Sequence, residues 1–96
     1  MPSTSLAGLV REMLESDRIE ANKVAVQAFV RKQRQGGREP EEEEMLTLLE
    51  RVLRIFSVED QQEVETYAKE VMTDLDTLGM GNTKTAKRLA NLLAIL

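Results

Sequence analysis

The sequence predicts an all-α fold, with about five helices packed as an irregular bundle in a single domain over residues 1–96. Three observations support this. A chain of 96 residues is long enough for one modest hydrophobic core and too short for two. Aromatic residues make up only 3% of the chain, so the core is aliphatic, whereas sheet proteins recruit more aromatic and β-branched residues. Apolar residues also recur at helical spacing along most of the sequence.

A short first helix is expected at the N-terminal end. Ser3, Thr4 and Ser5 are all competent N-caps. An apolar set follows at helical spacing and consists of Leu6, Leu9, Val10, Met13 and Leu14. Asp17 then has the position of a second N-cap, with Glu20 three residues later as its capping-box partner. We expect a break here, although one continuous helix through this point is also compatible with the pattern.

The second helix is expected over residues 18–34. Its middle, residues 23–30, is apolar on most faces and also alternates with period two, which is typical of a strand. A strand here would need a partner subunit, as in ribbon-helix-helix repressors, because the chain contains no second strand-like run. We therefore favour a helix, ended by Gly36 and Gly37 after a basic last turn.

Two longer helices, over residues 40–56 and 58–78, form the expected spine of the bundle. Pro40 suits the first turn of a helix, and the four glutamates that follow it lie at the positive end of the helix dipole. Ser57 is the expected N-cap of the next helix, with Asp60 at the N3 position. That helix carries the cleanest apolar seam in the chain, formed by Val64, Ala68, Val71, Leu75 and Leu78.

The glycines at positions 79 and 81 end this helix and lead into a last one, capped by Asn82 or Thr83. Residues 81–90, Gly-Asn-Thr-Lys-Thr-Ala-Lys-Arg-Leu-Ala, are similar to the first helix of a Fis-type helix-turn-helix. In that family a turn and a recognition helix follow, and the recognition helix enters the major groove. Five of the six residues that follow here are apolar, so no DNA-contacting residue is carried over from the resemblance.

The formal net charge of −4 conceals three segments of different sign. Residues 1–38 hold seven Lys or Arg and four acids, residues 39–78 hold three and thirteen, and residues 79–96 hold three and none. The segments therefore carry +3, −10 and +3, and can attract one another within a chain, across a dimer or on a charged partner. No apolar run is long enough for a leader or a membrane span, so we expect a cytoplasmic protein without membrane contact.

Catalysis is not expected. Histidine and cysteine are both absent, which removes the commonest general base, the commonest thiol nucleophile and the usual ligands of zinc sites. Carboxylates four residues apart, such as Glu70 and Asp74, are more simply a solvated helix face than an acid–base pair. The glutamates after Pro40 cannot converge on one cation, because consecutive helical residues point to different sides. We expect no enzyme activity, no cofactor and no metal.

Our leading hypothesis is a small regulatory or adaptor protein that binds another protein through apolar helix faces. The chain has more apolar helix surface than one small core readily absorbs, so we also expect a homodimer whose subunits share a core. The candidate protein-binding residues lie in the second and last helices and are Val26, Phe29, Val30, Leu92, Leu93, Ile95 and Leu96.

An alternative is a nucleic-acid-binding transcriptional regulator that contacts phosphates through two basic clusters. Its candidate residues are Arg31, Lys32, Arg34, Arg38, Lys84, Lys87 and Arg88. No aromatic residue lies among them to stack a base, so this is the weaker signal. A third hypothesis is an acidic inhibitor whose −10 segment mimics nucleic acid.

Overall fold

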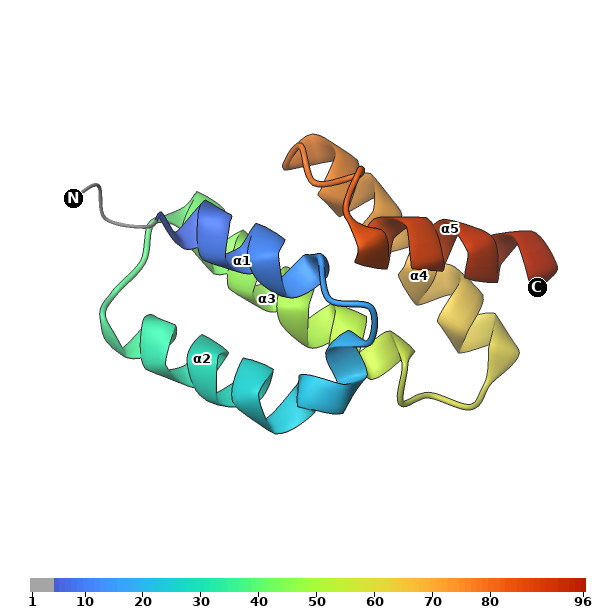
Figure 1. Cartoon of the computed structure of the whole chain (residues 1–96), viewed down its shortest axis with the longest axis horizontal. Coiled ribbons are helices and arrows are strands. Elements are labelled where there is room, and N and C mark those ends of the chain that lie inside the picture. The colour runs from blue at the N-terminus through green and yellow to red at the C-terminus, as the bar shows by residue number, and fades with distance from the viewer. Residues whose placement is uncertain (1–4) are drawn as a thin grey trace.

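A computed structural model describes residues 5–96, and over this range the chain is helical, without a strand (Figure 1). Its elements are α1 (Leu6–Leu14), the short 3-10 helix η1 (Ile19–Asn22), α2 (Lys23–Gln35), α3 (Pro40–Ile55), α4 (Gln61–Thr77) and α5 (Lys84–Ile95). The expected all-α fold with five α-helices is confirmed for the described residues. The strand considered for residues 23–30 is wrong, because this segment is the first part of α2.

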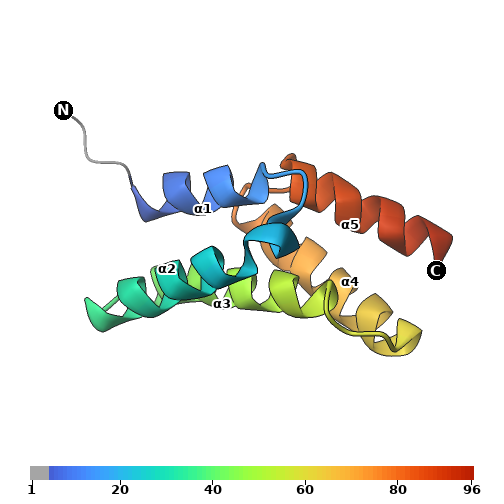
Figure 2. The ribbon, with the colours of Figure 1, turned by 60° about the horizontal axis from the view of Figure 1, so that its bottom comes forward.

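Helix α3 is the centre of the arrangement. Helices α1, α2 and α4 all pack on it, and α5 packs on α4 and also contacts α1. Figure 2 shows α1 and α5 on one side of the molecule, with α3 and α4 on the other. The molecule is elongated, measuring 43 × 24 × 23 Å along its principal axes. The pair α3–α4, expected as the spine, makes the most extensive contact between two helices.

The break after α1 lies where the sequence indicates it, but its local structure differs. The Ser5 hydroxyl accepts a hydrogen bond from the Gly8 amide at 3.1 Å and so caps α1, while the other two candidate caps lie outside the described residues. The expected capping box between Asp17 and Glu20 is wrong. A 3-10 turn forms there instead, and the Glu20 carboxylate accepts hydrogen bonds from Arg88, far along the chain.

Helix α3 starts at the expected residue, whereas the N-cap of α4 differs from the expected one. Pro40 occupies the first turn of α3, and the Glu42 side chain accepts from the Glu39 amide at 3.3 Å in a capping box. Helix α4 is capped by Asp60, whose carboxylate accepts from the amide of residue 62 at 2.8 Å. The expected cap Ser57 instead donates its hydroxyl to the Leu53 carbonyl at 2.6 Å. Helix α4 therefore starts at Gln61, three residues after the start that a Ser57 cap predicts.

Helix α4 ends in a Schellman motif, which reverses the chain direction so that α5 packs back on α4. Gly79 has a φ of 73°, and the Met80 amide donates to the Leu75 carbonyl at 2.7 Å. Arg11 of α1 reaches this turn and donates to the Gly79 carbonyl and, at 2.9 Å, to Asn82 Oδ1. Thr83 then caps α5 through the Ala86 amide. Side-chain contacts thus join α1 to the turn that precedes α5.

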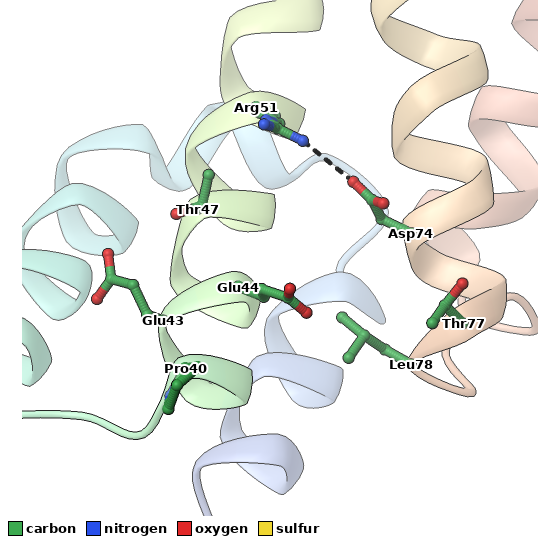
Figure 3. A pocket seen from close by; sticks show the side chains of 8 residues that line it. All are labelled: Pro40, Glu43, Glu44, Thr47, Arg51, Asp74, Thr77 and Leu78. Atoms are coloured by element: carbon green, nitrogen blue, oxygen red, sulfur yellow. Dashed lines mark hydrogen bonds and ion pairs between the residues drawn. The ribbon is translucent and has the colours of Figure 1, made fainter.

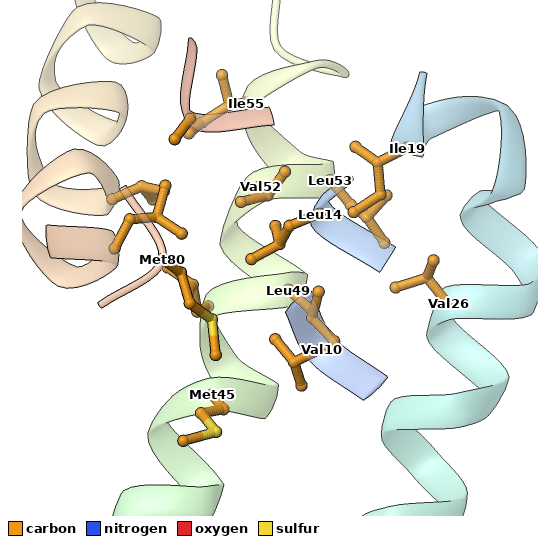
Figure 4. Close-up of a cluster of buried hydrophobic side chains, with 14 of the residues drawn as sticks. Val10, Leu14, Ile19, Val26, Met45, Leu49, Val52, Leu53, Ile55 and Met80 are labelled. Carbon is orange, nitrogen blue, oxygen red and sulfur yellow. The ribbon is translucent and has the colours of Figure 1, made fainter. Parts of the chain in front are cut away.

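One aliphatic core runs between the helices (Figure 4). The seam of α4 lies in it, because Val64, Ala68, Val71 and Leu75 are buried. No buried side-chain nitrogen or oxygen lacks a hydrogen-bond partner in residues 5–96. The exposed large hydrophobic residues of this range are Val24, Ile95 and Leu96. One chain therefore encloses most of its apolar surface, and less is left over than the sequence led us to expect.

Candidate functional site

A recess lined mainly by apolar side chains lies between α1 and α2, and we call it the α1–α2 groove. The two helices run antiparallel and both rest on α3, more extensively than on each other (Figure 1). No hydrogen bond or ion pair between described residues joins α1 to α2. The groove has a volume of about 320 Å³, and its lining residues are Leu9, Glu12, Met13, Ser16, Ile19, Asn22, Ala25 and Val26.

The groove exists because the apolar arcs of both helices are wider than the strip that α3 covers. On α1, Val10 and Leu14 are fully buried, whereas Leu9 and Met13 on the adjacent flank are only partly covered. On α2, Val26 is buried while its neighbour Ala25 is exposed. Apolar side chains on the two flanks therefore face a shared space that no third helix fills.

The seven apolar candidates from the sequence do not form one surface. Val26 and Val30 of α2 belong to the core, with 3% and 2% of their surface exposed, although Val26 also forms part of the groove lining. Phe29, Leu92 and Leu93 are half-buried against the core. Only Ile95 and Leu96 are exposed, with 81% and 43% of their surface accessible. The α2 and α5 members lie on different parts of the molecule (Figure 1).

Sequence reasoning missed the α1 and η1 side of the groove. Leu9 and Met13 were assigned to the face of the first helix, but nothing identified them as the part of that face left uncovered. Ile19 follows the break and belongs to no periodic set. The available signal was the breadth of the α1 arc, which exceeds the strip that one neighbouring helix covers.

The basic candidates are mostly engaged inside the chain. Arg34 forms ion pairs with Glu43 and Glu50, both at 2.7 Å, and the bond to Glu50 raises its pKa above the ordinary value. Arg38 pairs with Glu42 at 3.4 Å. In α5, Lys84 pairs with Asp17 and Arg88 with Glu20. The candidates that have no ion pair within residues 5–96 are Arg31, Lys32 and Lys87, all exposed.

Arg88 holds the junction between α5, η1 and the end of α3. Its Nη1 donates to Glu20 Oε1 at 2.6 Å, Nη2 donates to the second carboxylate oxygen, and the guanidinium carbon lies 3.9 Å from the centroid of the Phe56 ring. These hydrogen bonds lower the pKa of Glu20 against the opposing effect of burial, and raise the pKa of Arg88. The residues that resemble a Fis-type helix thus serve internal packing here, with Thr85, Ala86 and Leu89 buried.

A second recess, of about 480 Å³, separates the start of α3 from the end of α4 (Figure 3). Arg51 bridges it by pairing with Asp74 at 3.1 Å, while Glu44 and Leu78 face each other across it. Within residues 5–96 no group of three or more acidic side chains is placed to hold a metal ion.

Comparisons with known proteins give no assignment. No protein-family model matches the chain, and no curated protein and no solved structure matches it significantly. Over residues 5–96 no helix has the length and apolar character needed to cross a membrane.

Proposed function

We propose that this chain is a small regulatory or adaptor protein without catalytic activity, which binds an amphipathic helix of another protein in the α1–α2 groove. The observation that carries the proposal is the groove itself: two antiparallel helices rest on a third and leave an apolar recess between them. Helix-in-groove recognition uses this geometry, because a partner helix buries its apolar face between the two walls. A cytoplasmic location and self-association as a homodimer belong to the same proposal.

Two other functions have less support. Nucleic-acid binding requires cations that are free to meet phosphates, yet Arg34, Arg38 and Arg88 are all paired with carboxylates of the same chain. The acidic inhibitor requires a free negative surface. In that segment Glu42, Glu43, Glu50 and Asp74 pair with arginines and Glu65 pairs with Lys69, so five of its thirteen acids are engaged within the chain. Both alternatives predict binding that weakens steeply with salt, whereas an apolar groove predicts weak salt dependence.

Site-specific photocrosslinking tests the proposal. A benzophenone amino acid at Leu9, in the groove wall, is expected to form an adduct with a protein partner in extract of the producing cells. The same group at Thr73, exposed on α4, is the matched control and should give none. Ala25→Glu places a charge in the groove and should abolish the Leu9 adduct. Equal adducts from both positions, or an adduct that survives Ala25→Glu, would contradict the proposed site.

A further inference from the structure

We infer that the α1–α2 groove accepts the last turn of α5 from a second copy of this chain, so that self-association closes the groove to other partners. This inference rests on the proposed function, because it takes the groove to be a protein-binding surface. It adds the identity of one occupant and the regulation that follows.

The last turn of α5 is the most exposed apolar feature of the described chain. Ile95 has 81% of its surface exposed and Leu96 has 43%, although each is a large aliphatic side chain. Lys87, Asn91 and Ile95 are spaced by four residues, so they form one outward stripe, and all three are exposed. We call this stripe the outer face of α5. It presents an apolar end, an amide and a cation in a line along the helix.

The groove has the complementary chemistry. Its floor and walls are mainly apolar, with Leu9, Met13 and Ile19 among them, and Ser16 and Asn22 add hydroxyl and amide groups. Among the described residues that line it, Glu12 is the one with a charge, and that charge is negative.

Charge complementarity points to α5 as the occupant. Residues 84–96 contain three cationic and no acidic side chains, so no side chain of α5 repels Glu12. Lys84 and Arg88 are already paired with Asp17 and Glu20, whereas Lys87 has no ion pair within residues 5–96. Lys87 lies on the outer face, two turns before Ile95, and is therefore the cation available to an acidic groove wall.

The occupant has to come from a second copy because of where the two surfaces lie. The end of α5 is at one end of the molecule, whereas residues 9–26, which supply the groove lining, lie nearer its middle, on the side of the start of α5 (Figures 1 and 2). The molecule is 43 Å long, and α5 is held along its length by α4. An α5 end therefore cannot reach the groove of its own chain while the fold is intact.

Two such contacts, exchanged between two chains, form a closed two-fold dimer. Each groove is then occupied by the α5 end of the other chain. A partner helix must displace it, so the fraction of open grooves falls as the protein concentration rises. Self-association is in this way a regulator of the same site that binds the partner.

Disulfide trapping tests the contact directly, because the chain has no cysteine of its own. A chain with Ala25→Cys is mixed in equal amounts with a chain carrying Ile95→Cys, at tens of micromolar under mild oxidation, and the disulfide-linked heterodimer is followed with time. We expect it to form at least about tenfold faster than the product of the Ile95→Cys chain with a Val24→Cys chain. Val24 is the matched control, because it is exposed on α2 and lies outside the groove lining. Equal rates for the two mixtures would overturn the inference.

Sedimentation equilibrium gives an independent test. The wild-type chain is expected to be a dimer at tens of micromolar, and Ile95→Glu should weaken dimerisation at least about tenfold. Because Ile95 is exposed in the single chain, its replacement should leave the helical circular dichroism signal unchanged, and also the unfolding midpoint when both chains are diluted until they are monomeric. A wild-type monomer, or an Ile95→Glu dimer as tight as wild type, would overturn the inference. The proposed function fails separately, if the monomeric Ile95→Glu chain with the photocrosslinker at Leu9 still captures no partner.

Discussion

The junction that holds α5 and the α1–α2 groove are built next to each other but are closed in different ways. At the junction, Arg88 pairs with Glu20 and covers Phe56, and Arg11 binds the turn before α5 through Asn82. Across the groove, no polar contact between described residues joins the two helices. Elements of this fold are therefore joined where a long polar side chain reaches from a distant segment of the chain. Between α1 and α2 no such side chain makes a contact, and the apolar flanks of the two helices stay accessible.

The largest effect on stability is expected from a substitution in the packed face of α5. Leu89 of α5 is fully buried, so Leu89→Ala removes most of an aliphatic side chain and leaves a cavity. We expect the free energy of unfolding to fall by about 2–5 kcal/mol. Ile95→Ala on the same helix is the control and should change it by less than about 0.5 kcal/mol at a concentration at which the chain is monomeric, because Ile95 is exposed in the single chain. Urea denaturation followed by circular dichroism measures both values. Equal losses would mean that α5 is not docked by the face described.

A smaller loss of stability is expected when the polar contacts of Arg88 at the junction are weakened. Arg88→Lys keeps the charge but loses the two-pronged hydrogen bond to Glu20 and the stacking on Phe56. We expect a loss of about 1–2 kcal/mol in the free energy of unfolding. A double-mutant cycle with Glu20→Gln isolates the pair, and additive losses would show that the two side chains do not interact.

The same pair predicts a specific dependence on pH. Hydrogen bonds from Arg88 lower the pKa of Glu20, so its carboxylate stabilises the fold while it is ionised. This contribution is fully present above the unfolded-state pKa of about 4.3 and is lost as the pH falls through the lower folded-state value. The stability difference between wild type and Glu20→Gln should therefore be constant from about pH 5.5 to 7 and shrink below about pH 4. A difference that is the same at pH 3 and pH 7 would contradict the assignment.

Most of the fold followed from the sequence because local signals and periodicity agree. The seam from Val64 to Leu75, the Pro40 start and the glycine turn at 79 all lie where they were expected. The errors concern side chains with more than one available partner. Ser57 bonds backward to a carbonyl, and Glu20 bonds to Arg88 instead of a nearby amide. A choice between a local and a distant partner depends on tertiary geometry, which the local sequence does not contain.

The candidate site was less predictable for a related reason. Periodicity shows which residues form an apolar arc, but it does not show how much of the arc a neighbour covers. Val26 and Val30 are as apolar as the exposed Val24, and only packing on α3 separates them. The groove is a property of the spacing between α1 and α2, which is set by their common support and not by either sequence segment alone.

The smallest effect on stability is expected from a substitution in the α1–α2 groove. Met13 lines the groove and is only partly covered, whereas Met45 of α3 is 7% exposed. Methionine and glutamine have similar helix propensity, so Met→Gln at each position isolates the effect of the surroundings. At position 45 the amide enters the core without a partner and should lower the free energy of unfolding by about 1–3 kcal/mol. At position 13, at a concentration low enough for the chain to be monomeric, the amide stays in contact with water, and we expect a loss below about 1 kcal/mol. Thermal unfolding of the two variants measures both losses. Equal losses of unfolding free energy would mean that the groove is closed in solution within a single chain.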